Sequence, residues 1–157
     1  MDEFEKDDNI GRDIFAKLFK HGFKSLWFAP PRCWFDASGV TLNNKKLLYE
    51  IKYREKYTVE KWSGSTWLEK YKRDCFNVFN KENPGFELYY ICFWQDGWTL
   101  FDVNRRIEAK TSEWVATFPN YAPRTTSINT GYTEKRIVLL RYNPGEYKDK
   151  LRHYENN

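Results

Sequence analysis

Apolar residues recur at a helical spacing near the start of the chain. Five of them fall on one stripe of a helix: Ile10, Ile14, Phe15, Leu18 and Phe19. Gly22 follows the stripe and suits the left-handed position at which many helices end. The pattern predicts a helix from Asn9 to His21, preceded by an acidic polar lead-in, residues 1–9.

Extended segments follow this predicted helix. Residues 23–29 predict a first strand, and Pro30 and Pro31 then interrupt any ladder because proline has no N–H to donate. The sequence CWFDA, residues 33–37, predicts a second extended segment, and LLYEIKYRE, residues 47–55, predicts the next strand. The stretch between them is polar and turn-rich, so residues 33–54 predict a hairpin or meander with a long loop.

A second helix is predicted from Thr66 to Asn80. Thr66 and Glu69 have the spacing of a capping box. Apolar side chains then recur at a helical spacing, at Leu68, Tyr71, Cys75 and Phe79. The sequence NPG, residues 83–85, ends the helix.

The near-continuous apolar run FELYYICFW, residues 86–94, predicts a strand in the centre of a sheet. After a tight-turn signal, residues 98–103 predict an antiparallel neighbour or a continuation to the sheet edge. Further strands are predicted at residues 113–118 and 135–142, with a long loop between them. The order αβββαβ with extra C-terminal strands predicts one α/β or α+β domain, residues 10–142, with a mixed central β-sheet flanked by helices. Residues 143–157 are a charged C-terminal tail.

Composition narrows the class of protein. The 157 residues include 7 Trp, 11 Tyr and 12 Phe, more aromatic side chains than one small core needs, so some are available to stack on bases or sugars. Residues 1–9 carry five acids against one lysine, which leaves the rest of the chain at +8 for a net charge of +4. This balance is compatible with a polyanionic partner, but many soluble domains are equally basic.

Three cysteines without paired spacing argue against a disulfide framework and fit a reducing compartment. The acidic N-terminus lacks an apolar run, so it is not a signal peptide, and no apolar stretch approaches the ~18 residues that span a bilayer. These features predict a protein of the cytoplasm, in a bacterium or an infected host cell, with no membrane partner.

Candidate chemistry gathers on the predicted helix and two of the strands. Glu50 and Lys52 are two residues apart in a strand, so their side chains share a face. Such a pair by itself is most often a surface ion pair. Asp36, at the end of the preceding extended segment, can meet Glu50 if the two strands pair, and Asp13 lies on the first helix. Two carboxylates and the backbone carbonyl of Ile51 suit Mg²⁺ or Mn²⁺, with Lys52 beside the ion.

The combination Asp36…Glu50-Ile51-Lys52 resembles the PD-(D/E)XK, or restriction-endonuclease-like, nuclease superfamily. The sequence GRDIFAKLFKHGF, residues 11–23, resembles the first helix of its Holliday-junction-resolvase-like members, and the order of elements matches over residues 10–94. The chain departs from the family pattern in having Phe35 where a proline is common, and Asp13 where Glu is usual.

The resemblance implies a Mg²⁺-dependent endonuclease acting on DNA, either branched DNA or linear duplex, often as a homodimer. It implies that Asp36 and Glu50 bind the metal, that Lys52 orients or activates water, and that Asp13 acts through a metal-bound water. Basic residues are candidates for contacting nucleic acid: Arg54, Lys56, Lys70, Arg105 and Arg124. A solvated surface explains each of them equally simply. The competing hypothesis is a non-catalytic nucleic-acid- or protein-binding module of the same fold, for example a small phage protein.

Overall fold

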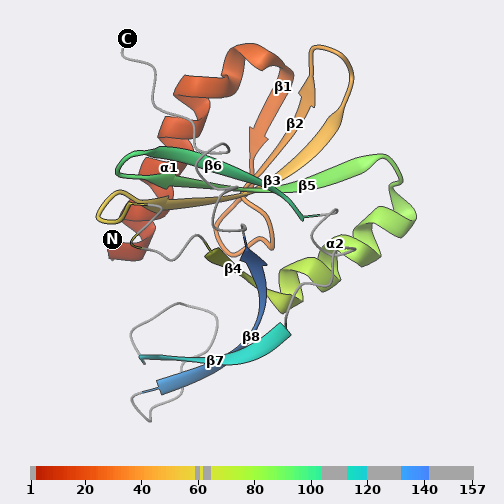
Figure 1. Ribbon diagram of the computed structural model, residues 1–157. Helices are drawn as coiled ribbons and strands as arrows, with labels where there is room; N and C mark the ends of the chain where they lie inside the picture. Colours follow the sequence, from red (N-terminus) through yellow and green to blue (C-terminus); the bar gives the residue numbers. More distant parts are fainter. Residues whose placement is uncertain (1–2, 59–60, 62–64, 104–112, 120–131, 142–157) are drawn as a thin grey trace.

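The computed structural model describes residues 3–58, 61, 65–103, 113–119 and 132–141. These residues form two helices and two β-sheets, one of five strands and one of three (Figure 1). The α+β class with a mixed sheet, predicted from the sequence, is confirmed. No helix of the described residues is long and apolar enough to cross a membrane.

The five-stranded sheet has the order β1-β2-β3-β5-β6. Its strands are β1 (Phe23–Phe28), β2 (Ala37–Thr41), β3 (Lys46–Arg54), β5 (Phe86–Trp94) and β6 (Gly97–Asp102). All neighbours pair antiparallel except β3 and β5, which run parallel from Lys46↔Phe86 to Arg54↔Trp94. A parallel pair needs a crossover connection, and α2 (Lys70–Glu82) supplies it.

One face of this sheet is covered by α1 (Glu3–Phe19), which continues into a short 3₁₀ turn, η1 (Lys20–Gly22) (Figure 1). Phe15 of this helix is buried in one cluster with Tyr49, Ile51 and Phe93 of the sheet. A Cβ atom on Gly11 would lie 3.2 Å from Cγ2 of Ile51, so glycine is what lets α1 approach β3 closely.

The opposite face of the sheet packs against α2. Phe76 of α2 shares a core cluster with Leu48 of β3 and with Tyr90 and Trp94 of β5. Trp94 donates a hydrogen bond from Nε1 to Thr99 Oγ1 across the β5–β6 hairpin, at 2.8 Å. Because β5 is buried on both faces, its near-continuous apolar sequence is explained, and the predicted central strand is confirmed.

The second sheet is antiparallel and has the order β4-β8-β7. Its strands are β4 (Ser65–Glu69), β7 (Glu113–Pro119) and β8 (Tyr132–Arg141). The two C-terminal strands were predicted, at 113–118 and 135–142, but β8 begins three residues earlier. Most of the predicted loop between them lies outside the described residues, as does the tail, residues 143–157.

Two predicted helix boundaries are wrong. Helix α1 begins at Glu3 rather than Asn9, so described residues 3–9 are helical and not an irregular lead-in. Acidic side chains near a helix N-terminus are favoured by the helix dipole, which suits this segment. Residues 66–69 are strand rather than helix, and Glu69 is the N-cap of α2 without a side-chain capping bond. At the end of the first helix, Gly22 does not have the left-handed φ that was predicted for it.

The second extended segment is also displaced from its prediction. Residues 33–36 are irregular, and β2 starts at Ala37, the last residue of the predicted segment, and continues to Thr41 through the stretch predicted to be a turn. Pro30 and Pro31 lie in a loop closed by a hydrogen bond from Ala29 N–H to the carbonyl of Asp36, at 2.9 Å. Trp34 and Phe35 are part of this loop, and their side chains pack against the core cluster on the α2 side of the sheet.

Candidate functional site

Asp36 is fixed at the point where β3 continues beyond β2. Its N–H donates to the carbonyl of Tyr49 at 2.8 Å, which prolongs the β2–β3 ladder by one residue. Its carboxylate oxygen Oδ2 accepts from the N–H of Ile51, also at 2.8 Å. The side chain of Asp36 therefore takes the place of the backbone partner that β2 no longer supplies to β3.

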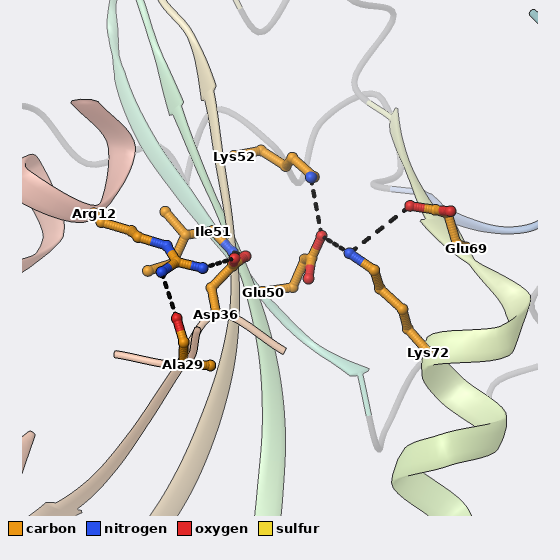
Figure 2. A network of polar contacts seen from close by, with 8 residues as sticks. All are labelled: Arg12, Ala29, Asp36, Glu50, Ile51, Lys52, Glu69 and Lys72. Carbon is orange, nitrogen blue, oxygen red and sulfur yellow. Dashed lines mark hydrogen bonds and ion pairs between the residues drawn. The ribbon is translucent and has the colours of Figure 1, made fainter. Parts of the chain in front are cut away.

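Arg12 of α1 holds the other oxygen of this carboxylate. Its Nη2 donates to Oδ1 of Asp36 at 2.8 Å, and its Nη1 donates to the carbonyl of Ala29 at 2.7 Å. One guanidinium thus ties α1 to both ends of the loop between β1 and β2 (Figure 2). The pair is only partly exposed, at 20% for Arg12 and 16% for Asp36.

Glu50 is the most deeply buried charged residue of the site, with 2% of its surface exposed. Its Oε1 atom lies 2.6 Å from Lys72 Nζ of α2 and 3.0 Å from Lys52 Nζ of the same strand (Figure 2). Its Oε2 atom is buried and has no hydrogen-bond partner among the described residues. The predicted shared face of Glu50 and Lys52 is confirmed, and Lys72 is a third member that the sequence did not indicate.

The charges in this cluster shift one another's protonation. Burial raises the pKa of Glu50, but attraction to Lys52 and Lys72 outweighs it, so the pKa falls to about 2. Burial lowers the pKa of Lys52, yet Glu50 and Asp36 raise it well above its ordinary value. The pKa of Asp36 is raised, by burial first and by repulsion from Glu50 second. At neutral pH Glu50 is therefore an anion and Lys52 a cation in the chain without a metal.

Helix α1 presents different residues to the site from those predicted. Asp13 is exposed, whereas Arg12 reaches Asp36. Asp8 lies one turn before Arg12 on the same side of the helix, and its charge is among the causes that raise the pKa of Lys52. Asp8 is therefore one acidic residue of α1 whose charge acts on the site, while the proposed role of Asp13 stays a prediction.

The predicted nucleic-acid contacts fall in different surroundings. Arg54 is partly buried on β3, where burial lowers its pKa but Tyr90 and Cys92 outweigh this effect and raise it. Lys56 is exposed in the turn after β3. Lys70 Nζ lies 2.6 Å from Oδ2 of Asp74, as an ion pair along α2. Arg105 and Arg124 lie outside the described residues.

The apolar stripe predicted for the second helix starts at Leu68, which lies in β4, and this stripe does not include Lys72. With the helix beginning at Lys70, its buried residues are Lys72 and Phe76, one turn apart. Tyr71, which the sequence assigned to the apolar stripe, is instead 42% exposed. The available signal in the sequence was a lysine one helical turn before Phe76. A lysine on the core side of a helix needs a carboxylate partner, which would have pointed to Glu50.

The oxygen atoms of the site fit a hard divalent cation that keeps several of its waters. Asp36 and Glu50 supply carboxylates, and Glu50 Oε2 is a buried oxygen without a partner among the described residues. The N–H and C=O of one strand residue point to the same edge, so the Ile51 carbonyl faces the side on which its N–H meets Asp36. Among the residues that the structure describes, no cluster of three or more His, Cys, Asp or Glu could hold a metal ion.

The comparisons with known proteins add no relative. No family model matches the chain, and no curated protein or solved structure does either.

Proposed function

We propose that this chain is a Mg²⁺- or Mn²⁺-dependent nuclease that hydrolyses phosphodiester bonds of DNA on a restriction-endonuclease-like core. The observation that carries the proposal lies where β3 extends beyond β2: Asp36 binds the N–H of Ile51, the neighbouring residues Glu50 and Lys52 form an ion pair, and burial and repulsion from Glu50 raise the pKa of Asp36. The order of α1, β1, β2, β3, α2 and β5 supports it, because this is the order that the PD-(D/E)XK resemblance implies. Strand β4 is an addition to that order.

Each residue of the cluster has a role in this chemistry. Asp36, Glu50 and the Ile51 carbonyl would hold the cation, which when bound polarises the phosphate and lowers the pKa of water. Lys52 is positively charged, so it would orient the attacking water and offset negative charge on the phosphorane rather than accept a proton. Arg12 and Lys72 hold the two carboxylates in place from opposite faces of the sheet.

The experiment is plasmid cleavage. Supercoiled plasmid is incubated with the chain in Mg²⁺, in Mn²⁺ and in EDTA, and nicked and linear products are separated on a gel. We expect cleavage only with a divalent cation, loss of cleavage in Asp36→Asn and Glu50→Gln, and a loss of at least about 100-fold in Lys52→Ala. Glu82→Gln is the matched control, since Glu82 is an exposed carboxylate of α2.

The variants must stay folded, which circular dichroism checks. Cleavage by folded Asp36→Asn or Glu50→Gln at the wild-type rate would remove the assignment. Two further variants compare the acids of α1: we expect Asp8→Asn to slow cleavage slightly, because the negative charge of Asp8 contributes to the raised pKa of Lys52. If Asp13→Asn slows it instead, the position given by the family resemblance is the relevant one.

A second candidate function is favoured by one observation. The two carboxylates already lie against three cations, those of Arg12, Lys52 and Lys72. A site neutralised from within suits a non-catalytic module that binds nucleic acid or protein. Binding of DNA without cleavage in either cation would favour this module over the nuclease.

A further inference from the structure

An exposed tryptophan lies close to the proposed active site. Trp27 of β1 is 54% exposed, although tryptophan is usually well buried. Its cross-strand partner in β2 is Ser38, and the cross-strand partner of Ser38 in β3 is Leu48. Leu48 belongs to the core cluster on the α2 side of the sheet. Partners across a sheet share a face, so Trp27 lies on the same face as Glu50 and Lys52.

The indole ring of Trp27 packs beside other aromatic rings. Its centroid lies 6.0 Å from that of Phe35, and Phe35 lies 4.8 Å from Trp34. Trp34 is 5.8 Å from Phe79 of α2, so the row is anchored in the core. We call Trp27, Phe35 and Trp34 the aromatic ladder. Its inner rings hold Trp27 in place, and a ring that is already ordered loses little entropy when a flat ligand stacks on it.

The aromatic ladder is connected to the site through the backbone, because Phe35 immediately precedes Asp36. The backbone N–H of Asp36 donates a hydrogen bond to the carbonyl of Tyr49 in β3. Neighbouring strands are about 4.8 Å apart and residues rise about 3.4 Å along a strand. The Cα atom of Trp27 is then about 8 Å from that of Asp36 and about 12 Å from that of Glu50. Trp27 and the two carboxylates are therefore close enough for one short segment of a nucleic-acid strand to reach both.

We propose that Trp27 is a stacking platform for an unpaired base of single-stranded DNA, on the same strand as the phosphate that a cation at Asp36 and Glu50 would hold. The identity of the ligand rests on the proposed function. A base in a duplex has both faces covered by its neighbours, whereas an unpaired base offers a free face to an indole. The loop between β1 and β2, which carries Trp34 and Phe35, also carries Arg32, an exposed cation that would attract a phosphate of such a strand.

The test measures binding without cleavage. The full chain is titrated in EDTA at low salt against fluorescein-labelled oligothymidylate of about 12 nucleotides, and fluorescence anisotropy gives the affinity. A second probe is an abasic strand of equal length, and a third is a hairpin duplex. We expect Trp27→Ala to weaken binding of oligothymidylate at least about fivefold and to leave binding of the other two probes within about twofold.

Two variants act as controls. Trp27→Phe keeps an aromatic ring, so we expect it to retain binding within about threefold of wild type. Leu42→Ala removes an apolar side chain that is 61% exposed at the far end of the β1–β2 pair, and should change nothing. The proposal is overturned if Trp27→Ala binds oligothymidylate as wild type does, if the abasic strand loses as much affinity, or if the wild-type chain does not bind oligothymidylate.

The two proposals fail separately. If the plasmid is cut in a Glu50-dependent way but Trp27→Ala has no effect on binding, the nuclease stands and the platform falls. If Trp27→Ala selectively loses oligothymidylate but no cation supports cleavage, the platform stands and the nuclease falls.

Discussion

Two ion pairs on α2 have equal length and unequal burial, and this contrast yields the sharpest prediction. Lys72 Nζ lies 2.6 Å from Glu50 Oε1, with 11% and 3% of the two side chains exposed. Lys70 Nζ lies 2.6 Å from Asp74 Oδ2, with 28% and 47% exposed. Because the distances match, a difference in their effect on stability reports the surroundings rather than the contact.

We expect Lys72→Met to destabilise the fold by about 3 kcal/mol, because it leaves Glu50 buried with Lys52 alone at 3.0 Å. A loss of 3–5 kcal/mol is typical when one partner of a buried pair is removed, and the remaining lysine places this case at the low end. Lys70→Met should cost less than about 0.5 kcal/mol, since solvent screens that pair. Methionine keeps most of the aliphatic stem in both variants.

Urea unfolding followed by tryptophan fluorescence measures both variants against wild type. If the two substitutions cost the same within about 0.5 kcal/mol, burial does not decide the strength of these pairs. Adding Glu50→Gln to Lys72→Met removes the uncompensated charge, so the double variant should be more stable than the sum of the single losses predicts. Additive losses would show that Lys72 does not stabilise the fold through Glu50.

A divalent cation should partly replace the missing lysine, and this links the stability measurement to the proposed function. The melting temperature of Lys72→Met should therefore rise more on addition of Mn²⁺ than that of wild type does, because ligand binding to the folded state stabilises it. Equal shifts in the two proteins would argue that the cation does not bind near Glu50.

Two further predictions concern acid stability and backbone packing. The pKa of Glu50 is about 2 in the folded chain against 4.5 for an ordinary Glu. Ionised Glu50 therefore contributes about 3 kcal/mol to the free energy of unfolding above pH 4.5, and this contribution is lost as the pH falls toward 2. Glu50→Gln should flatten this part of a stability–pH curve, and an unchanged slope would contradict the assignment. Gly39→Ala should cost about 1–3 kcal/mol, because the added Cβ would lie 2.5 Å from a ring carbon of Phe23. Gly22→Ala is the control, because nothing lies within 4 Å of the added Cβ, and its free energy of unfolding should stay within about 0.5 kcal/mol of wild type. Thermal unfolding measures both variants, and equal losses of stability would show that the close contact with Phe23 does not set the cost.

The parts of the fold that were predicted are those with a local signal. The uninterrupted apolar run from Phe86 to Trp94 indicated a strand with two buried faces, and β5 has them. The two-residue spacing of Glu50 and Lys52 placed their side chains on one face, and they meet at 3.0 Å. The sequence NPG ended α2 as predicted, with Asn83 as its C-cap and Gly85 at a φ of 98°.

The errors arose where a distant part of the chain decides the local structure. Residues 66–69 have the spacing of a capping box, but they form β4 because they pair with β8, about 70 residues later. That pairing satisfies backbone groups that a helix would otherwise satisfy, and no local pattern encodes it. Leu68, the first residue of the predicted helical stripe, lies in β4, and within α2 the buried residues are Lys72 and Phe76 rather than Tyr71.

By itself the sequence determined the spacing of charged residues along β3 and the class of fold, since both follow from periodicities of two and of about 3.6 residues. Only the tertiary structure decided which charges meet. Arg12 reaches Asp36 because α1 packs closely on β3, and Lys72 reaches Glu50 because the α2 crossover lies on the opposite face. Contacts of this kind depend on how helices seat on a sheet, and this is set by the packing of the whole core rather than by any short segment.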